Sequence, residues 1–233
     1  MSGTNIVKWV LLGLAGVLLV ALFIFNANNK PENMHMQNYP WNQAMVVGSV
    51  EAPNKMVEYS DYFCEFCASF NEQASSAKFN EEYIDSGKLS LETRIITVLS
   101  ELSPNTEQGA ESAYCAADQD KFTEYSNHLV PRIKQDFFDK NIGTKSSGKP
   151  IEKLPLTYFE QSAKAVGMDS NKFVDCMTEQ PHKEEISTST QRAVNMGVRG
   201  LPTVVVNDYV ASGSANGWQG FEMMLKAGGV ETD

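Results

Sequence analysis

Two cysteines separated by two residues, Cys64 and Cys67, are the part of this sequence best suited to chemistry. The run before them is rich in the residue types of a buried strand, namely Val57, Tyr59, Tyr62 and Phe63. The run after them has apolar residues at helical spacing, at Phe66, Phe70, Ala74 and Ala77. A strand, a short turn and a helix place Cys64 at a helix N-terminus, where free backbone amides and the helix dipole stabilise a thiolate. Cys67 follows one turn later, so the spacing predicts a redox-active dithiol with Cys64 as the nucleophile.

Two other uses of a Cys-x-x-Cys pair remain open. The pair can be half of a zinc site, although such sites usually add a second close pair of Cys or His. Here the other two cysteines stand alone and the three histidines are scattered, at Cys115, Cys176, His35, His128 and His182. The pair can also be a structural disulfide, but a bridge between neighbouring turns closes a loop too short to constrain the unfolded chain strongly. We therefore expect neither a metal nor a cofactor.

The N-terminal region is predicted to be a membrane anchor. Residues 6–25 form an apolar run that only Lys8 interrupts, which is long enough to cross a bilayer as a helix. A cleaved signal peptide has a shorter apolar core and ends in a small-x-small site, whereas here Phe25 precedes Asn26 and Ala27. We therefore expect an uncleaved anchor over 1–25, and a cleaved signal peptide is the alternative.

The rest of the chain reads as a linker followed by one α/β domain. Residues 26–43 are rich in Asn, Pro and Gln, as a tether is, and the domain is expected over 44–233. The expected order is a strand carrying Glu58, the Cys-x-x-Cys helix, a strand at 89–98, a helical block, strands at 203–207 and 209–211, and a helix at 218–227. A polar loop at 143–150 interrupts the helical block.

The net charge of −10 argues against a nucleic-acid partner, and four cysteines in one domain suit an oxidising compartment.

This order resembles a thioredoxin fold with a helical insertion at about 105–197, and the chain is similar to DsbA-type thiol–disulfide oxidoreductases, in particular the membrane-anchored bacterial group. The resemblance covers roughly 48–225. It is carried by GSVEAP at 48–53, EYSDYFCEFC at 58–67, AYCAADQDKF at 113–122 and GVRGLPTVVVN at 197–207. The four motifs together are specific to this family, whereas a Cys-x-x-Cys alone is not.

The resemblance implies a role for Pro202. At the matching position the family has a cis-proline that faces the disulfide, and the preceding backbone, here Leu201, offers an edge to an extended substrate peptide. Phe66, between the two cysteines, is expected to contact the same substrate. From the local sequence alone, an ordinary trans proline at the start of a strand is equally acceptable.

Glu58 is the predicted proton carrier. Strand alternation turns it to the same side as Ser60 and Tyr62, and in the family a carboxylate at this position lies beneath the disulfide and handles the proton of the second cysteine. Burial should raise the pKa of such a carboxyl. The alternative is a solvated glutamate on an edge strand. Asp61 is a weaker candidate and is expected to act in a turn or a helix cap.

The chain departs from the family at two positions. Glu65 follows Cys64 where the family often has proline, and a carboxylate beside Cys64 should oppose thiolate formation and make a milder oxidant. Leu201 stands where Thr or Val commonly precedes the proline, which bears on substrate preference.

Cys115 and Cys176 resemble a second, structural pair of some relatives, and two buried free thiols are the alternative.

The resemblance implies an enzyme in the cell membrane, with one span and its catalytic domain outside the cytoplasm. It would donate the Cys64–Cys67 disulfide to reduced or misoxidised extracytoplasmic proteins and be reoxidised by a membrane redox partner. A reductase or isomerase of the same fold is one alternative. A non-catalytic module that binds peptides over Pro202 is another, and the intact cysteine pair together with Glu58 counts against it.

Overall fold

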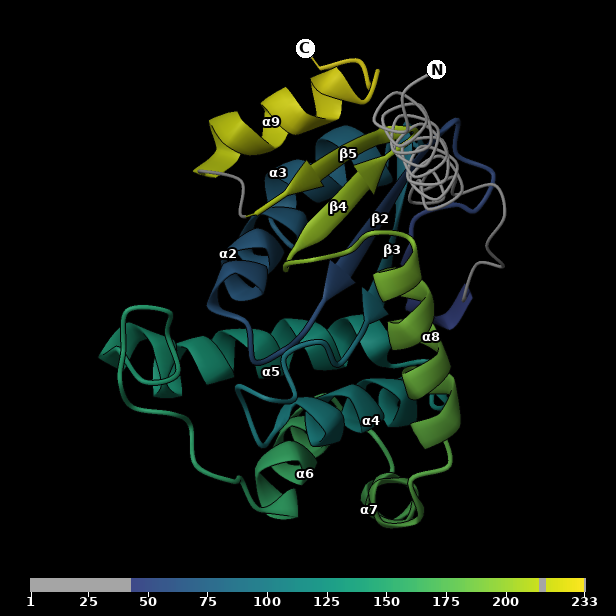
Figure 1. Ribbon diagram of the computed structural model, residues 1–233. Helices are drawn as coiled ribbons and strands as arrows, with labels where there is room; N and C mark the ends of the chain where they lie inside the picture. The colour runs from purple at the N-terminus through teal and green to yellow at the C-terminus, as the bar shows by residue number, and fades with distance from the viewer. Residues whose placement is uncertain (1–42, 214–216, 233) are drawn as a thin grey trace, which may run out of the picture. The chain divides into compact units, whose positions relative to one another are not determined.

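The protein is described here from a computed structural model, in which residues 43–213 and 217–232 are described (Figure 1). Within these ranges no helix combines the length and the apolar character needed to cross a membrane. The expected anchor over 1–25 lies outside the described residues, as does the expected linker over 26–43 except for its last residue.

A five-stranded mixed sheet forms the centre of the domain, in the order β1-β3-β2-β4-β5 (Figure 1). The strands are β1 (Val46–Val47), β2 (Asn54–Ser60), β3 (Leu89–Ile95), β4 (Thr203–Val206) and β5 (Tyr209–Ser212). β2 runs parallel to β3 and antiparallel to β4, with Glu58 opposite Thr93 on one side and Val204 on the other. The strand that leads to the Cys-x-x-Cys is therefore a central strand, paired along both edges.

Helices connect β2 to β3, fill the segment between β3 and β4, and follow β5. The α-helices are α2 (Glu65–Ala74), α3 (Ala77–Phe79), α4 (Thr106–Ala117), α5 (Phe122–Asp136), α6 (Leu156–Ala165), α7 (Ser170–Glu179), α8 (Lys183–Asn195) and α9 (Gly217–Ala227). Shorter elements are the 3-10 turns η2 (Gln43–Met45) and η4 (Phe138–Lys140) and the π-helical turn η3 (Asn80–Ile84). The insertion thus consists of the five helices α4 to α8.

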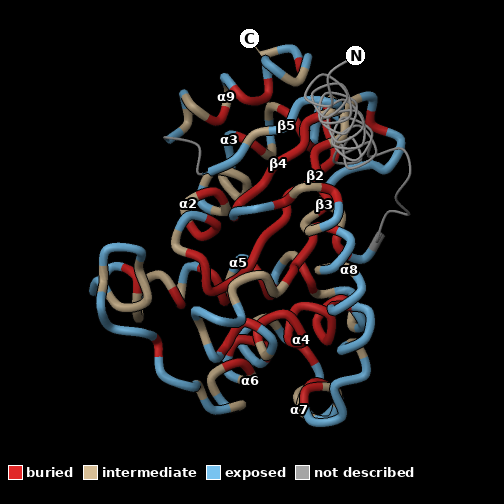
Figure 2. The backbone as a smooth tube through the Cα atoms, in the orientation of Figure 1, coloured by how far each residue is buried: buried red, intermediate tan, exposed pale blue. Residues whose placement is uncertain are grey.

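The two faces of the sheet are covered by different helices. Met56 faces a core that includes Phe70 from α2, Phe79 from α3 and Phe221 from α9. Val57 and its neighbours on the opposite face pack with residues of α8 and with both cysteines of the pair. Figure 2 shows the buried part of the backbone running through β2, β3 and β4 and into α4. Because both faces are covered, β2 lacks the polar alternation of a half-exposed strand.

The insertion has a core of its own. Side chains from α4, α5, α6 and α7 enclose it, and its members include Tyr125, Leu129, Phe159 and Phe173, each of them fully buried. Phe63, which precedes Cys64, belongs to this same cluster. The core of the insertion therefore reaches the turn that carries the reactive cysteine.

Most expected elements are confirmed, with three corrections. The helix after Cys64 ends at Ala74, so Ala77 belongs to a separate short helix, and Phe66 is 37 % exposed and lies off the buried face. The strand expected at 89–98 ends at Ile95. The two-residue strand β1 has no signal in the sequence, because two valines are too short a pattern to mark a strand.

Cys115 on α4 and Cys176 on α7 are joined by a disulfide, and the two residues are 61 positions apart in the sequence. The alternative, that these two cysteines are buried free thiols, is therefore wrong. In the chain-entropy account a bridge across such a loop restricts the unfolded chain by about 4 kcal/mol. The bridge ties two helices of the insertion core together.

Replacing both Cys115 and Cys176 with Ala should lower the free energy of unfolding by about 3–4 kcal/mol, since the unfolded chain regains the entropy that the bridge removes. Urea unfolding of the domain, with the Cys64–Cys67 pair kept reduced in both proteins, measures the difference. Disulfide exchange at Cys64 should persist in the variant under folding conditions. Equal unfolding midpoints and slopes for the two proteins would contradict the prediction.

Candidate active site

Cys64 is the N-cap residue of α2, and its sulfur accepts a hydrogen bond from the backbone N–H of Cys67 at 3.4 Å. The cysteine side chain is 6 % exposed. The pKa of Cys64 is lowered, first by a hydrogen bond from the Cys67 side chain and further by the backbone amides of Cys67 and Phe66, which outweigh the effect of burial. The Cys67 thiol and the amides of the first helical turn thus both favour the thiolate form of Cys64.

Cys67 has the opposite character. It lies one turn into α2, is 3 % exposed, and carries a free thiol like Cys64. Burial raises the pKa of Cys67 well above its usual value, and the neighbouring Cys64 and Glu58 add to the rise. The pair therefore consists of one stabilised thiolate and one thiol that keeps its proton.

Glu58 lies on β2, close enough for its charge to act on Cys67. It is 3 % exposed, its Oε2 accepts a hydrogen bond from Thr93 Oγ1 at 3.5 Å, and its Oε1 has no hydrogen-bond partner among the described residues. Burial raises the pKa of Glu58 from 4.5 to about 7, against a smaller opposite effect of the Ser60 and Thr93 hydroxyls. A solvated glutamate on an edge strand, the alternative above, is not what the fold contains.

Glu58, Asp61 and Cys67 share one cavity of about 70 Å³, which Ser60 and Tyr62 also line. Glu58 and Ser60 thus share one side of β2, as alternation predicted, whereas Asp61 and Tyr62 follow the end of the strand and both reach the cavity. The space is sufficient for a few water molecules, and its walls offer them polar partners. A carboxyl in such a cavity can pass a proton to or from Cys67 directly or through water.

Asp61 is more than the turn residue that the sequence predicted. Its Oδ1 does accept a hydrogen bond from the Phe63 backbone N–H at 2.8 Å, and its carbonyl oxygen accepts one from Cys64 N at 3.1 Å. The side chain is nevertheless only 1 % exposed, and burial raises the pKa of Asp61 to about 7. Two buried carboxyls therefore lie at the site, and the charge of Asp61 acts against the Cys64 thiolate.

Leu201 and Pro202 lie on the other side of Cys64. The Leu201–Pro202 peptide bond is cis, and the Leu201 carbonyl oxygen is 3.6 Å from Cys64 Sγ, within reach of a thiol hydrogen bond. Both residues are buried. The backbone edge next to the nucleophile thus comes from the segment before β4, almost 140 residues away in the sequence.

The turn between β2 and α2 is fixed by the insertion. The Tyr62 hydroxyl and Ser126 Oγ on α5 are 2.5 Å apart, within hydrogen-bond distance. The Phe63 ring lies against Gly109 of α4, where an added Cβ would be 2.9 Å from the ring. Only glycine leaves room for the ring at that position, so α4 and α5 together set the position of Cys64.

Glu65, one residue after Cys64, is hydrogen-bonded to a distant loop. Its Oε1 accepts a hydrogen bond from the backbone N–H of Lys145 in the loop between α5 and α6, at 2.6 Å. The carboxylate whose charge opposes the Cys64 thiolate is Asp61. The expected effect of Glu65 on the thiolate stays a prediction, whereas the charge of Asp61 does raise the pKa of Cys64.

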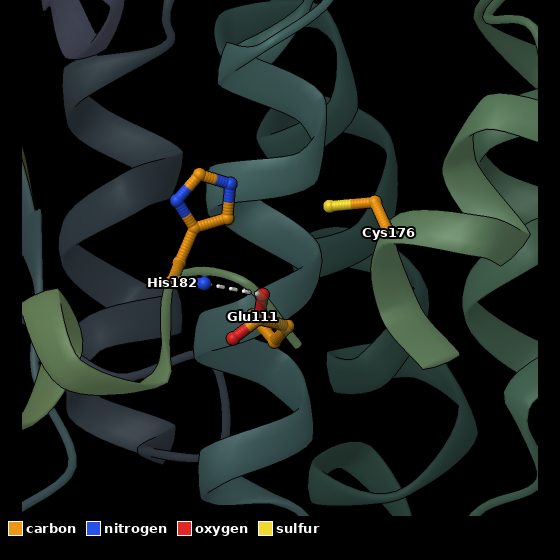
Figure 3. A group of neighbouring side chains, drawn as sticks. All are labelled: Glu111, Cys176 and His182. Carbon is orange, nitrogen blue, oxygen red and sulfur yellow. Dashed lines mark hydrogen bonds between the residues drawn. The ribbon is translucent and has the colours of Figure 1, made fainter. Parts of the chain in front are cut away.

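A second group of potential ligands lies away from the pair, at Glu111, Cys176 and His182 (Figure 3). Glu111 accepts a hydrogen bond from the His182 backbone N–H at 3.1 Å, which ties the start of α8 to α4. Cys176 is bonded to Cys115 and has no thiolate to offer. The group therefore serves as a structural contact.

A reactive cysteine at a helix N-cap, a buried partner one turn later and a cis-proline beside them, on a five-stranded thioredoxin-type sheet, define a thiol–disulfide oxidoreductase. The family model described as thioredoxin matches residues 42–227, and the chain belongs to that family.

Individual relatives agree with the resemblance to DsbA-type proteins, which is confirmed. A curated protein of Bacillus anthracis, named probable disulfide bond formation protein D, is 23 % identical over 203 residues, which are 87 % of this chain and 88 % of the relative. The crystal structure of oxidised BdbD from Bacillus subtilis has a TM-score of 0.63 at 17 % identity, covering 79 % of this chain and 91 % of the other. That of Wolbachia pipientis alpha-DsbA1 has a TM-score of 0.63 at 19 % identity, covering 84 % and 96 %.

Replacing Glu58 with Gln should change how stability depends on pH. The raised pKa means that the folded protein holds the Glu58 proton between pH 4.5 and about 7 while the unfolded chain releases it, so stability falls as the pH rises through this range. The variant should lose roughly 2 kcal/mol less than the wild type between pH 5 and pH 7.5. Urea unfolding of the reduced proteins at both pH values measures the loss.

The matched control is Glu72→Gln, which changes an exposed carboxylate on α2. It should follow the wild-type pH dependence, and Asp61 should maintain part of the decline in all three proteins. A Glu58→Gln protein with the wild-type decline would mean that Glu58 is not a desolvated carboxyl.

Proposed function

We propose that this protein is an extracytoplasmic oxidase that donates its Cys64–Cys67 disulfide to the thiols of substrate proteins. The observation that supports the proposal most directly is the contrast between the lowered pKa of Cys64 and the raised pKa of Cys67. A stabilised thiolate favours the reduced form of the pair, and this makes the disulfide form a better oxidant.

The reaction consists of two exchanges. A substrate thiolate attacks Cys64 Sγ of the oxidised protein, the bond between Cys64 and Cys67 breaks, and Cys67 leaves as a thiolate that takes a proton. A second substrate thiolate then attacks the substrate sulfur of the mixed disulfide and releases Cys64 as a thiolate. The substrate dithiol loses two electrons and the protein disulfide gains them. Glu58 is the proposed donor of the proton to Cys67, because the two share the enclosed cavity.

Substrate binding is assigned to the surface beside Cys64. The backbone at Leu201 would pair with an extended substrate segment, and Phe66, 37 % exposed next to the pair, would contact its side chains. Pro202 would keep this edge in place. The substrates are reduced or misoxidised extracytoplasmic proteins, a proposal that the name of the Bacillus anthracis relative supports.

The proposed location is the cell membrane, with the catalytic domain on the outer side. The apolar run over 6–25 supports a single span, and the use of four cysteines supports an oxidising compartment. A membrane redox partner would accept the two electrons from the reduced pair and restore the disulfide. The predicted linker over 26–43 would hold the domain near such a partner.

A reductase or isomerase is the second candidate. The buried charge of Asp61 opposes the Cys64 thiolate and so shifts the pair toward a less oxidising potential. The reduction potential, measured against glutathione, separates the two directions. A value above about −200 mV supports the oxidase, and a value well below it supports the reductase.

Replacing Cys67 with Ser should trap mixed disulfides between Cys64 and substrate proteins, because the resolving thiol is lost while the nucleophile at the helix N-cap remains. The assay incubates the variant, activated as a mixed disulfide with glutathione, with a reduced protein that carries a single cysteine, so that no second substrate thiolate can release the complex. The covalent complexes are then weighed by mass spectrometry. Cys64→Ser is the control and should trap none, and equal trapping by both variants would reverse the assignment.

Glu58→Gln should slow the oxidation of a peptide dithiol by roughly ten- to a hundredfold at neutral pH, with water as the substitute proton carrier. Attack at Cys64 should remain, so that mixed disulfides still form. Asp61→Asn is the informative comparison, because Asp61 lines the same cavity. If Asp61→Asn slows turnover and Glu58→Gln does not, the proton carrier is Asp61 and not Glu58.

A further inference from the structure

The loop between α5 and α6 has a defined fold of its own. The backbone N–H of Gly143 donates to the Lys149 carbonyl at 2.8 Å, and that of Ser147 donates to the Thr144 carbonyl at 3.0 Å. Gly143 has φ +70°, and a Cβ there would be 2.6 Å from the Ile151 side chain. The loop over 143–149 is thus a closed turn seated on Ile151, in a conformation that requires glycine at its base.

This loop reaches from the insertion to the redox helix. The backbone N–H of Lys145 donates to Glu65 Oε1 at 2.6 Å, which joins residues 80 positions apart. Glu65 is the first residue of α2 and follows the nucleophile Cys64 directly. The described contact therefore ties the loop to the helix at the position closest to the reactive sulfur.

A cleft of about 530 Å³ lies beside the nucleophile and the loop. Cys64 and Leu201 line it, and so do Lys145 and Ile151. Its remaining apolar lining includes Phe63, Phe66, Leu99 and Leu102. The volume is in the range of pockets that enclose a small ligand or a large side chain, and the nucleophile opens onto it.

Two of these apolar side chains are unusually exposed for their size. Leu102 is 75 % exposed and Phe66 is 37 % exposed, and they line the same cleft. Exposed large apolar side chains beside a nucleophile indicate a surface that another molecule covers during the reaction. Since the attacking group is a substrate thiolate at Cys64, the covering molecule is the part of the substrate next to its cysteine.

We propose that Glu65 is a positioning residue that holds the 143–149 loop at Lys145, and that the cleft kept open in this way binds a large apolar side chain adjacent to the substrate cysteine. The inference rests on the proposed function. It makes the insertion a part of the substrate site and assigns the acidic residue after Cys64 a role in selectivity. Asp61, and not Glu65, then supplies the charge that acts on the thiolate.

The test compares Glu65→Ala with Glu65→Gln. Glutamine keeps an acceptor oxygen for the Lys145 N–H but carries no charge, whereas alanine removes both. The substrates are two peptide dithiols, one with Leu next to the attacking cysteine and one with Gly there, and oxidised glutathione is the terminal oxidant. Glu72→Ala is the matched control, because Glu72 is an exposed carboxylate on the same helix that also contacts the insertion, at Lys134.

For the Leu peptide, Glu65→Ala should raise KM by about five- to tenfold, as expected when one hydrogen bond that fixes a loop is lost. The change in kcat should be smaller, and the KM of the Gly peptide should rise less than twofold. Glu65→Gln should restore most of the wild-type KM, and Glu72→Ala should resemble the wild type. The same fold change in KM for the two peptides in Glu65→Ala, or equal effects of the Ala and Gln replacements, would overturn the proposal.

A parallel measurement separates this proposal from the proposed function. The thiolate absorbance of the reduced proteins gives the pKa of Cys64 in each variant. If Glu65 acted by its charge, both replacements would lower that pKa to the same extent and the loop would be irrelevant. If no protein, the wild type included, oxidised either peptide while exchanging with glutathione, the proposed function itself would fail, whatever Glu65 does.

Discussion

The asymmetry between two sulfur atoms one helical turn apart is the constraint on which this site depends. Cys64 meets the free amides at the start of α2, while Cys67, three residues later, is enclosed by the protein. The start of the helix therefore favours the thiolate of Cys64, while burial keeps the proton on Cys67. Neither effect needs a cofactor or an unusual residue. Both need α2 to begin at one particular position at the end of β2.

The enclosed cavity places a second demand on the fold. Glu58 and Asp61 are both buried beside Cys67, and the pKa of each is raised to about 7. At neutral pH the two carboxyls are thus near the point at which a proton moves most easily. Two ionised carboxylates and a thiolate in one cavity repel one another strongly at low dielectric. The proton content of the cavity and the redox state of the pair are therefore linked. A carboxyl that takes up a proton loses its charge, and this favours a negative charge on a nearby cysteine sulfur.

Much of this arrangement follows from the sequence, and the exceptions have physical reasons. The orientation of Glu58 toward the buried cavity was predicted correctly because alternation along a strand depends only on local geometry. Asp61 was underestimated, since a turn residue is normally solvated and only the insertion, which the local pattern does not describe, closes over it. Phe66 was misplaced on the buried helix face for a related reason. Its spacing fits that face, but the first turn of α2 points toward the cleft. Gly109, Leu99, Leu102 and Lys145 carried no local signal at all, since their importance comes from contacts with distant segments.

The insertion accounts for these exceptions and is an integral part of the site. A glycine on α4 makes room for Phe63, and a serine on α5 meets the hydroxyl of Tyr62, so the turn before Cys64 has the insertion core as its support. The disulfide between α4 and α7 lies within that same core. Loss of packing in the insertion would therefore move the start of α2, and with it the amides that stabilise the Cys64 thiolate. The thioredoxin-type sheet provides the strand and the helix, whereas the insertion determines where the sulfur lies and what surrounds it.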